Sequence, residues 1–301
     1  MPLNGTQSQQ AQRAQEELAV KVRLEAKFSS ELARLFRRIS SDLSTSLANT
    51  GGTVAASSYT NDLKIILDRN YKRVQRRFVN EITAFLQANR RNLDEQIIAE
   101  LTLIANARGT TLNKMIQQMK TNIRTELDAF RQFNVAQSAA IIIDTTQKEI
   151  DRAVQKANQN LIDELGDEPT NGQLARESRA IFGGRQVARS KMIAATETQK
   201  VAEGTKQIER DNFLSMRNNS TATQLDLPPI EPKEIWVTQG DSLVRDGDGT
   251  VFNHLAADGQ LKVNGTFTVS NQLLRFPGDI SLGATAGNVI RCRCSAVTVI
   301  S

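Results

Sequence analysis

The hydrophobic positions of the first half of the chain follow a helical period. Apolar residues recur at intervals of three and four in four stretches, which begin near Ala11, Leu63, Leu112 and Ile143. The clearest stripe comprises Leu63, Leu67, Tyr71, Val74, Phe78, Ile82 and Phe85, and the same spacing continues through Leu93, Ile97, Leu101 and Ile104. Such stripes need a partner surface. The pattern therefore predicts long amphipathic helices that pack antiparallel in an elongated bundle over residues 1–165.

Proline and glycine divide the chain after this helical half. No proline occurs between Pro2 and Pro169, and the stretch 166–172 contains Pro169 and the pair Asn171-Gly172, which indicates a linker. We therefore expect a second domain over residues 166–301. It begins with a short helix over 174–182 that ends at Gly183-Gly184, and a further helix follows over 186–213.

The pattern changes again beyond a polar, proline-rich connection at 218–232, which cannot stay helical. The stretches 234–238, 260–269 and 295–300 are rich in β-branched residues or alternate apolar with polar residues, as strands do. The predicted fold class is α+β. A long N-terminal amphipathic helical bundle is followed by a small α+β C-terminal domain.

Composition indicates a folded, charge-rich protein, with 24% charged and 39% hydrophobic residues. The net charge of +5 lies in residues 1–165, and the remainder of the chain is neutral. No stretch has the roughly 20 apolar residues that cross a bilayer, so we expect no membrane partner. Residues 1–17 are rich in glutamine and lack an apolar core, which suggests synthesis in the cytoplasm with reduced cysteines.

The two cysteines and the single histidine form the first candidate site. In an extended segment, Cys292 and Cys294 point to the same face, so both sulfurs can converge with His254 on one ion. Thiolate and imidazole are ligands that zinc prefers, and Asp258, Asp246 or Asp241 could complete the coordination. The alternative is that the cysteines are small buried apolar residues with the histidine hydrogen-bonded nearby. We predict no cofactor, with a structural zinc at this cluster as the alternative.

Other chemical motifs are weaker. Asp241, Asp246 and Asp248 lie among glycines as in a calcium loop, but turn formation by Asp-Gly pairs explains them as well. A nucleophilic mechanism would have to use His254, because the chain has no other histidine. Glu197 could act as a general acid or base, and the glycines before Arg185 could bind a phosphate. We do not predict an enzyme.

A basic stripe stands out in the second helical stretch. Its members, which share one helical face, are Arg69, Lys72, Arg73, Arg76 and Arg77. Such a face can contact the phosphates of double-stranded DNA without reading sequence, or acidic patches on a partner protein. Asp68 and Glu81 lie nearby, so an ordinary solvated helix face is an equal alternative.

The order of several motifs in the last third of the chain carries a resemblance to a known family. These are Glu197 in Thr-Glu-Thr, Trp236-Val237-Thr238, Asp241, Val244-Arg245-Asp246, His254, Asp258-Gly259, Pro277-Gly278-Asp279 and Cys292-Arg293-Cys294. In this order, residues 175–300 resemble the C-terminal domain of the phage Mu protein F-like minor head proteins, which include the SPP1-type head morphogenesis proteins. The chain departs from the family pattern at Ala195, Ala257 and Arg291, where the family usually has Arg, Leu and Asn.

The resemblance implies a virion component that is present in few copies in the phage head and is made in the host cytoplasm. Its partners would be the portal protein and other capsid or head proteins, and it would assist head assembly and contact genomic DNA. The rival hypothesis is a metal-dependent enzyme or toxin-type domain built on His254, Cys292 and Cys294.

Overall fold

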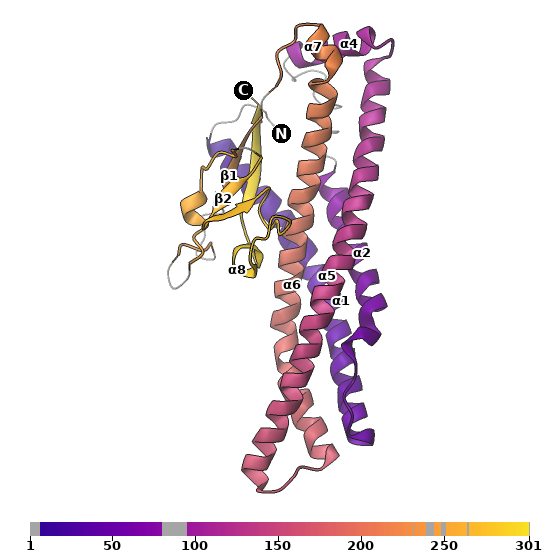
Figure 1. The fold of residues 1–301 in the computed structure, drawn as a ribbon, viewed down its shortest axis with the longest axis vertical. Coiled ribbons are helices and arrows are strands. Elements are labelled where there is room, and N and C mark those ends of the chain that lie inside the picture. The colour runs from indigo at the N-terminus through magenta and orange to yellow at the C-terminus, as the bar shows by residue number, and fades with distance from the viewer. Residues whose placement is uncertain are drawn as a thin grey trace. The chain divides into compact units, whose positions relative to one another are not determined.

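A computed structural model describes residues 7–79, 95–230, 232–238, 244–247, 251–263 and 265–300. The predicted α+β class is confirmed, with long helices in the N-terminal part of the chain and short antiparallel strands near the C-terminus (Figure 1). The helices are α1 (Gln7–Thr50), α2 (Thr60–Phe78), α4 (Glu95–Ala107), α5 (Leu112–Leu165), α6 (Asn171–Arg217) and α7 (Ser220–Gln224). Among the described residues, none of the helices is both long and apolar enough to cross a membrane.

Two long helices are more continuous than the sequence predicts. The stretches expected around 112–130 and 143–161 form the single helix α5, and the helices expected over 174–182 and 186–213 form the single helix α6. Gly183 and Gly184 therefore do not end a helix. A glycine in a helix interior costs only about 1 kcal/mol relative to alanine. Gly183 lies where a Cβ would stand 3.4 Å from the Ser40 hydroxyl of α1, so its small size suits the close packing of the two helices.

The helical stripe predicted in the second stretch continues past α2. Its apolar positions Ile82, Phe85 and Leu93 lie outside the described residues.

The chain forms two compact units, each built from separate stretches. The first comprises Met1–Val22, Lys72–Phe130 and Ala195–Ser301, and the second comprises Arg23–Tyr71 and Arg131–Ala194. The division falls inside helices α1, α2, α5 and α6. The domain boundary predicted between residues 165 and 166 coincides with the turn that joins α5 to α6, whereas the compact units divide the chain elsewhere.

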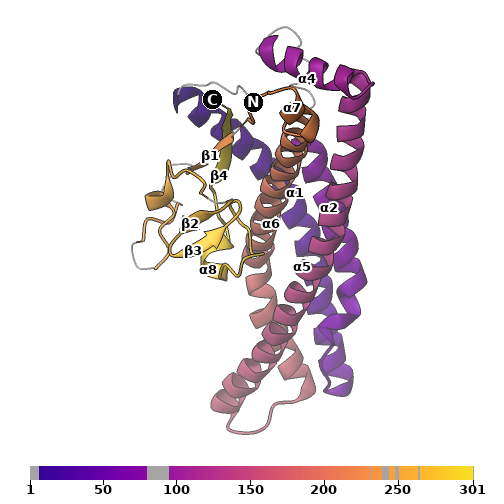
Figure 2. The same ribbon diagram turned by 45° about the horizontal axis from the view of Figure 1, so that its top comes forward.

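The second unit is a bundle of α1, α2, α5 and α6, which run side by side (Figure 2). Its core residues follow the predicted helical spacing, and Leu32, Leu63 and Ile150 are fully buried. Polar contacts join neighbouring helices around the bundle: Asn70 to Glu31, Tyr71 to Ser138, Arg189 to Glu149, and Arg189 stacked over the Phe36 ring. The amphipathic stripes are therefore buried against one another, as amphipathic helices require.

The helical part of the first unit has its own apolar core. Residues of α4, α7, the start of α5 and the end of α6 build it: Ile97, Leu101, Ile104, Ala105, Met115, Met119, Ile123, Leu127, Phe213, Met216 and Ala222. Gly204 of α6 lies directly against the Phe130 ring of α5, where any Cβ would overlap the ring. Glycine at this position lets the two helices approach closely.

The rest of the first unit is a C-terminal module, residues 232–300. Strand β1 (Pro232–Val237) pairs antiparallel with β4 (Ser295–Ile300), and β2 (Phe267–Val269) forms a hairpin with β3 (Gln272–Leu274). These strands confirm the predicted strand regions, although only short bridges form at Leu261 and Val263. Short helical turns, η2 (Leu255–Ala257) and α8 (Ala286–Val289), lie in the connections. The module core comprises Trp236, Ala257, Phe267, Val269, Leu274, Val289, Cys292 and Cys294.

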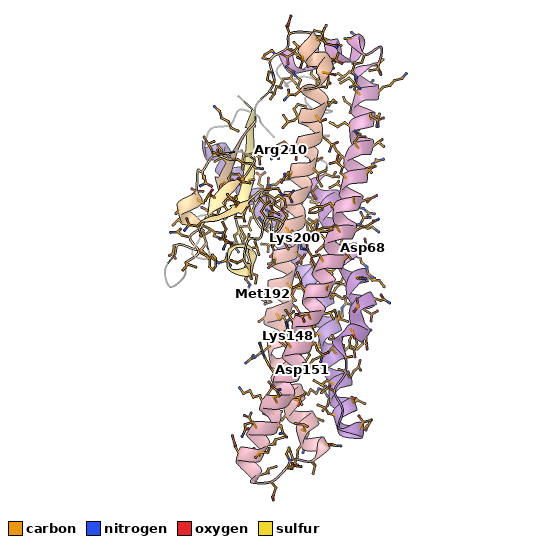
Figure 3. All side chains as sticks on the ribbon, viewed as in Figure 1. Asp68, Lys148, Asp151, Met192, Lys200 and Arg210 are labelled. Atoms are coloured by element: carbon orange, nitrogen blue, oxygen red, sulfur yellow. The ribbon has the colours of Figure 1, made fainter. Side chains whose placement is uncertain are left out.

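Helix α6 covers the free edge of strand β4, and the segment just before that strand, with polar side chains. These contacts run from Thr196 to the Arg291 N–H, from Gln199 to the Cys294 carbonyl, from Glu203 to the Ala296 N–H and from Lys206 to the Ala296 carbonyl. The four helix positions are three, four and three residues apart, which places them on one face of α6. Side chains thus satisfy backbone groups that a further strand would otherwise pair. Lys200 and Arg210, on the same stretch of α6, are labelled in Figure 3.

Candidate metal centre in the C-terminal module

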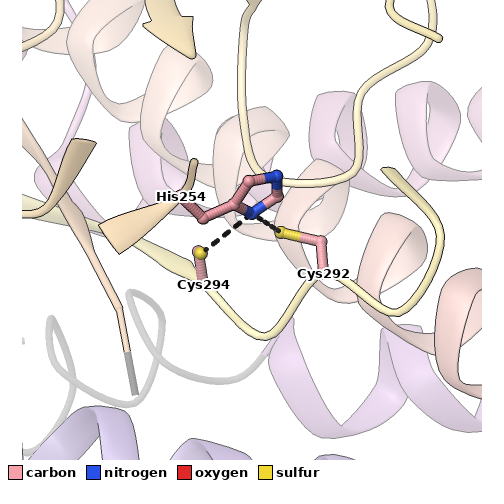
Figure 4. Close-up of side chains that lie close together, drawn as sticks. All are labelled: His254, Cys292 and Cys294. Carbon is pink, nitrogen blue, oxygen red and sulfur yellow. Dashed lines mark hydrogen bonds between the residues drawn. The ribbon is translucent and has the colours of Figure 1, made fainter. Parts of the chain in front are cut away.

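The predicted cluster of one histidine and two cysteines is present in the C-terminal module. His254 stands immediately before η2, and its backbone N–H donates to the Arg245 carbonyl at 2.8 Å. Cys292 and Cys294 lie between α8 and β4, in a segment that brings both sulfurs to the same side (Figure 4). His254 therefore meets two cysteines that lie 38 and 40 residues further along the chain, inside the core that surrounds Trp236.

The geometry of the cluster suits metal coordination. His254 Nδ1 lies 3.6 Å from Cys292 Sγ and 3.5 Å from Cys294 Sγ, and all three ligand atoms lie within 4.8 Å of one another. In a tetrahedral zinc site, bonds of about 2.3 Å to sulfur and about 2.0 Å to nitrogen place these atoms roughly 3.6 Å apart. The three side chains, each at most 4% exposed, therefore form a group that can bind a metal ion.

Backbone and side-chain hydrogen bonds hold the imidazole from its other side. His254 Nε2 lies 3.0 Å from Oδ1 of the fully buried Asn288. The Asn288 amide nitrogen donates to the Val269 carbonyl at 2.9 Å and to Gln272 Oε1 at 3.0 Å. A buried partner on the outer nitrogen is what metal-bound histidines usually have.

The two sulfurs differ in acidity. A hydrogen bond from Cys294 holds the pKa of Cys292 well below its ordinary value, although burial opposes it. Burial raises the pKa of Cys294, the neighbouring Cys292 raises it further, and the Trp236 indole N–H opposes both effects. The Cys294 thiol thus resists ionisation beside Cys292. A divalent cation would remove this conflict, because its charge balances two thiolates.

The acidic residues predicted to complete the coordination do not join this group. Asp258 is exposed, and its Oδ1 accepts hydrogen bonds from the Thr238 N–H at 2.7 Å and from the Thr238 hydroxyl at 3.1 Å. The prediction that Asp258 is a ligand is therefore wrong, because a turn between β1 and η2 already uses its carboxylate. Asp246 is exposed and pairs with Asn253, and Asp241 and Asp248 lie outside the described residues.

The remaining residues that carry the family resemblance have structural contacts. The Arg245 guanidinium donates to the Ile290 carbonyl, which ties the stretch before His254 to the stretch before Cys292. The Gly259 N–H donates to the Trp236 carbonyl at 2.8 Å, and Gly259 takes a positive φ of 75°, which favours glycine. Glu197 on α6 forms an ion pair with Lys200 at 2.6 Å, so its carboxylate has a structural partner.

Asp279 closes the turn formed by Pro277 and Gly278. Its carboxylate accepts hydrogen bonds from the N–H and side chain of Arg275 and from the N–H and hydroxyl of Ser281, at 2.9–3.1 Å. Burial alone would raise the pKa of Asp279, but these bonds hold it below its ordinary value. Gly278 takes a φ of 86° and packs against the Lys200 backbone on α6. The turn thus packs directly onto that helix.

The predicted basic stripe lies on α2. Arg69, Lys72, Arg76 and Arg77 are exposed and Arg73 is half-buried. Arg69 lies 3.6 Å from Glu31, so part of its charge is balanced within the protein. The Gly183-Gly184-Arg185 stretch is not a phosphate site, because it lies inside α6, where helical bonding uses the backbone N–H groups.

Sequence reasoning missed two features of the site. Asn288 supports His254, although a lone buried amide has no readable motif. A buried charge network also borders β4, where Lys21 donates to Glu203 at 2.7 Å and to the Ser295 hydroxyl at 3.3 Å. The sequence feature that could have predicted this network is the spacing of Glu203, Lys206 and Arg210, which places three charged residues on one face of α6.

The fold and cluster define an α-helical protein with a small mixed module built around a histidine and two cysteines. No family model, curated protein or solved structure matches the chain. The functional conclusions therefore rest on the residues and their geometry.

Proposed function

We propose that this chain is a phage minor head protein, similar to the Mu F-like proteins, that binds the portal and other head proteins in the virion. One observation carries the proposal: several of the motif residues that make up the resemblance contact one another in the C-terminal module. Trp236 packs edge-on to His254, Gly259 bonds to Trp236, and His254 bonds to Arg245 and faces both cysteines.

The helical units suit an assembly role. Long helices offer extended surfaces for protein partners, and Phe133, Ile141 and Val187 are large apolar residues that are at least half exposed on α5 and α6. Exposed aromatic and aliphatic side chains are common anchors of protein interfaces. The exposed cations of α2 supply the proposed non-specific contact with genomic DNA.

Composition of the virus particle tests the proposal first. Mass spectrometry of purified particles should find the chain in low copy number. The full-length chain should also co-purify with the portal protein of the same genome. Particles that lack the chain, or a portal protein that never retains it, would reject the assembly role.

The DNA contact needs a separate test with a matched control. Exchange of Arg76 and Arg77 for alanine should weaken binding to duplex DNA and reduce its salt dependence. The same loss of charge at the exposed Arg124 and Lys148 should change binding less. Equal effects of the two double variants would show that α2 has no special part in DNA binding.

We further propose that His254, Cys292 and Cys294 hold a structural zinc ion. A Zn²⁺ ion with two thiolates and a neutral imidazole carries no net charge, which suits a cluster buried in an apolar core. The ion would tie the segment before β4 to the loop at His254. Elemental analysis should find one zinc per chain, and a chelator should lower the melting temperature. A purified protein that contains no zinc, and whose melting temperature does not change with a chelator, would reject the zinc site.

The alternative is a metal-dependent enzyme or toxin-type domain on the same three residues. Three protein ligands leave one coordination position for water or substrate, as catalytic zinc sites do. Burial of all three side chains favours the structural assignment. Turnover by the isolated protein that His254→Ala abolishes would favour the alternative.

A further inference from the structure

The orientation of the Asn288 amide can be traced to backbone groups. The Thr285 N–H, which can only donate, lies 2.9 Å from Gln272 Oε1 and therefore identifies this atom as the oxygen. The Asn288 atom that faces Gln272 Oε1 and the Val269 carbonyl must then be its nitrogen, because both of these neighbours only accept. The Asn288 oxygen consequently faces His254.

This orientation determines the tautomer of His254. An amide oxygen cannot donate, so Nε2 at 3.0 Å must carry the hydrogen. Nδ1 of the neutral ring then has a free lone pair, and this is the atom that faces both sulfurs. The chain of hydrogen bonds from Thr285 to His254 thus presents the nitrogen that a metal needs.

We infer that Asn288 is a positioning residue of the metal centre. It holds His254 as the Nε2–H tautomer, with Nδ1 toward the ion. This inference rests on the proposed metal site.

The composition of the chain makes the tautomer directly measurable. The protein has one histidine, so the ¹⁵N spectrum of the full-length metal-free chain contains one imidazole. The expected result is a protonated Nε2 and an unprotonated Nδ1. A proton on Nδ1 of the metal-free protein would overturn the assignment.

The variant Asn288→Ala tests the effect on affinity, with Co²⁺ as the probe because its absorption reports thiolate coordination. Asn288→Ala should weaken Co²⁺ binding by roughly 10–100-fold, the usual effect of losing a partner of a ligand. The control Asp258→Ala should leave binding unchanged. Circular dichroism shows whether each variant folds. A folded Asn288→Ala protein that binds Co²⁺ like the wild type would overturn the role of Asn288.

The outcomes separate the two proposals. A wild-type chain that binds neither Zn²⁺ nor Co²⁺ rejects the metal site and the positioning role of Asn288, while the spectrum of the metal-free protein still decides the tautomer. A wild-type chain that binds metal, with a folded Asn288→Ala variant that binds equally well, rejects the positioning role alone.

Discussion

Lys21 and Glu203 form a buried ion pair in the first compact unit, with 2.7 Å between Nζ and Oε1 and side chains that are 3% and 1% exposed. Glu203 also lies 3.0 Å from Lys206 and accepts the Ala296 N–H at 3.1 Å. The carboxylate therefore joins three elements: α1, α6 and β4. Removal of both charges from water is costly, so such a pair is tolerated only while its hydrogen bonds are complete.

We predict that Lys21→Met destabilises the protein by about 3–5 kcal/mol, because Glu203 would lose one of its two cations inside the protein. Urea unfolding at neutral pH measures the change. The double variant Lys21→Met, Glu203→Leu should regain part of the loss, since neither residue then leaves a buried charge unpaired.

An exposed ion pair supplies the control. Lys148 and Asp144 lie 2.7 Å apart on α5, and both side chains are about 60% exposed. Lys148→Met should change stability by no more than about 0.5 kcal/mol, because water screens such pairs. Equal effects of Lys21→Met and Lys148→Met would show that burial does not strengthen the Lys21 interaction.

Because of the Glu203 carboxylate, we expect the folding stability of the protein to fall at acid pH. Burial alone would raise the pKa of Glu203, but Lys206 and Lys21 hold it below its ordinary value of 4.5. A carboxylate whose pKa is lower in the folded protein than in the unfolded chain stabilises the fold at pH values above its unfolded pKa. This stabilisation is lost as the pH falls through the folded pKa. We expect stability to fall below about pH 4.5 and to depend less on pH in Glu203→Gln. Denaturant unfolding between about pH 7 and pH 3 measures both slopes, and parallel slopes would contradict the prediction.

Two glycines of α6 should respond in opposite ways to alanine. A Cβ at Gly204 overlaps the Phe130 ring, so Gly204→Ala should destabilise by about 1–3 kcal/mol. A Cβ at Gly184 meets nothing, so Gly184→Ala should stabilise by about 0.4–1 kcal/mol. Thermal unfolding of the two variants checks the signs, and Phe130→Leu should relieve the effect at Gly204. Two changes of the same sign would contradict the packing argument.

Helix α6 shows what sequence periodicity can and cannot predict. Its helical character was readable, but its length was not, because Gly183 and Gly184 are local signals that packing against α1 outweighs. The polar face at Gln199, Glu203 and Lys206 would be assigned to solvent from sequence alone. The edge of β4 reverses that assignment, since its backbone groups need partners. Such a need arises only from the tertiary fold.

The candidate site was predictable to the extent that ligand chemistry is local. The Cys-x-Cys spacing and the single histidine identified the cluster, because alternate residues of an extended segment face the same side. Asn288 was not identifiable, since its role depends on Gln272 and Val269, which the β2–β3 hairpin brings close. Asp258 was misassigned because sequence proximity to His254 does not show which way a carboxylate points.

Asp258 therefore provides the last prediction. Its Oδ1 accepts both the N–H and the hydroxyl of Thr238, which holds the end of β1 against η2. Asp258→Ala should lower the free energy of unfolding by about 1 kcal/mol, the typical worth of a hydrogen bond. Asp258→Asn, which keeps the acceptor oxygen, should restore most of it. Metal content should be the same in all three proteins, because the carboxylate is bonded to Thr238 and not to the cluster. A loss of zinc in Asp258→Ala at full stability would instead make Asp258 a ligand and would require the turn at Thr238 to open when the metal binds.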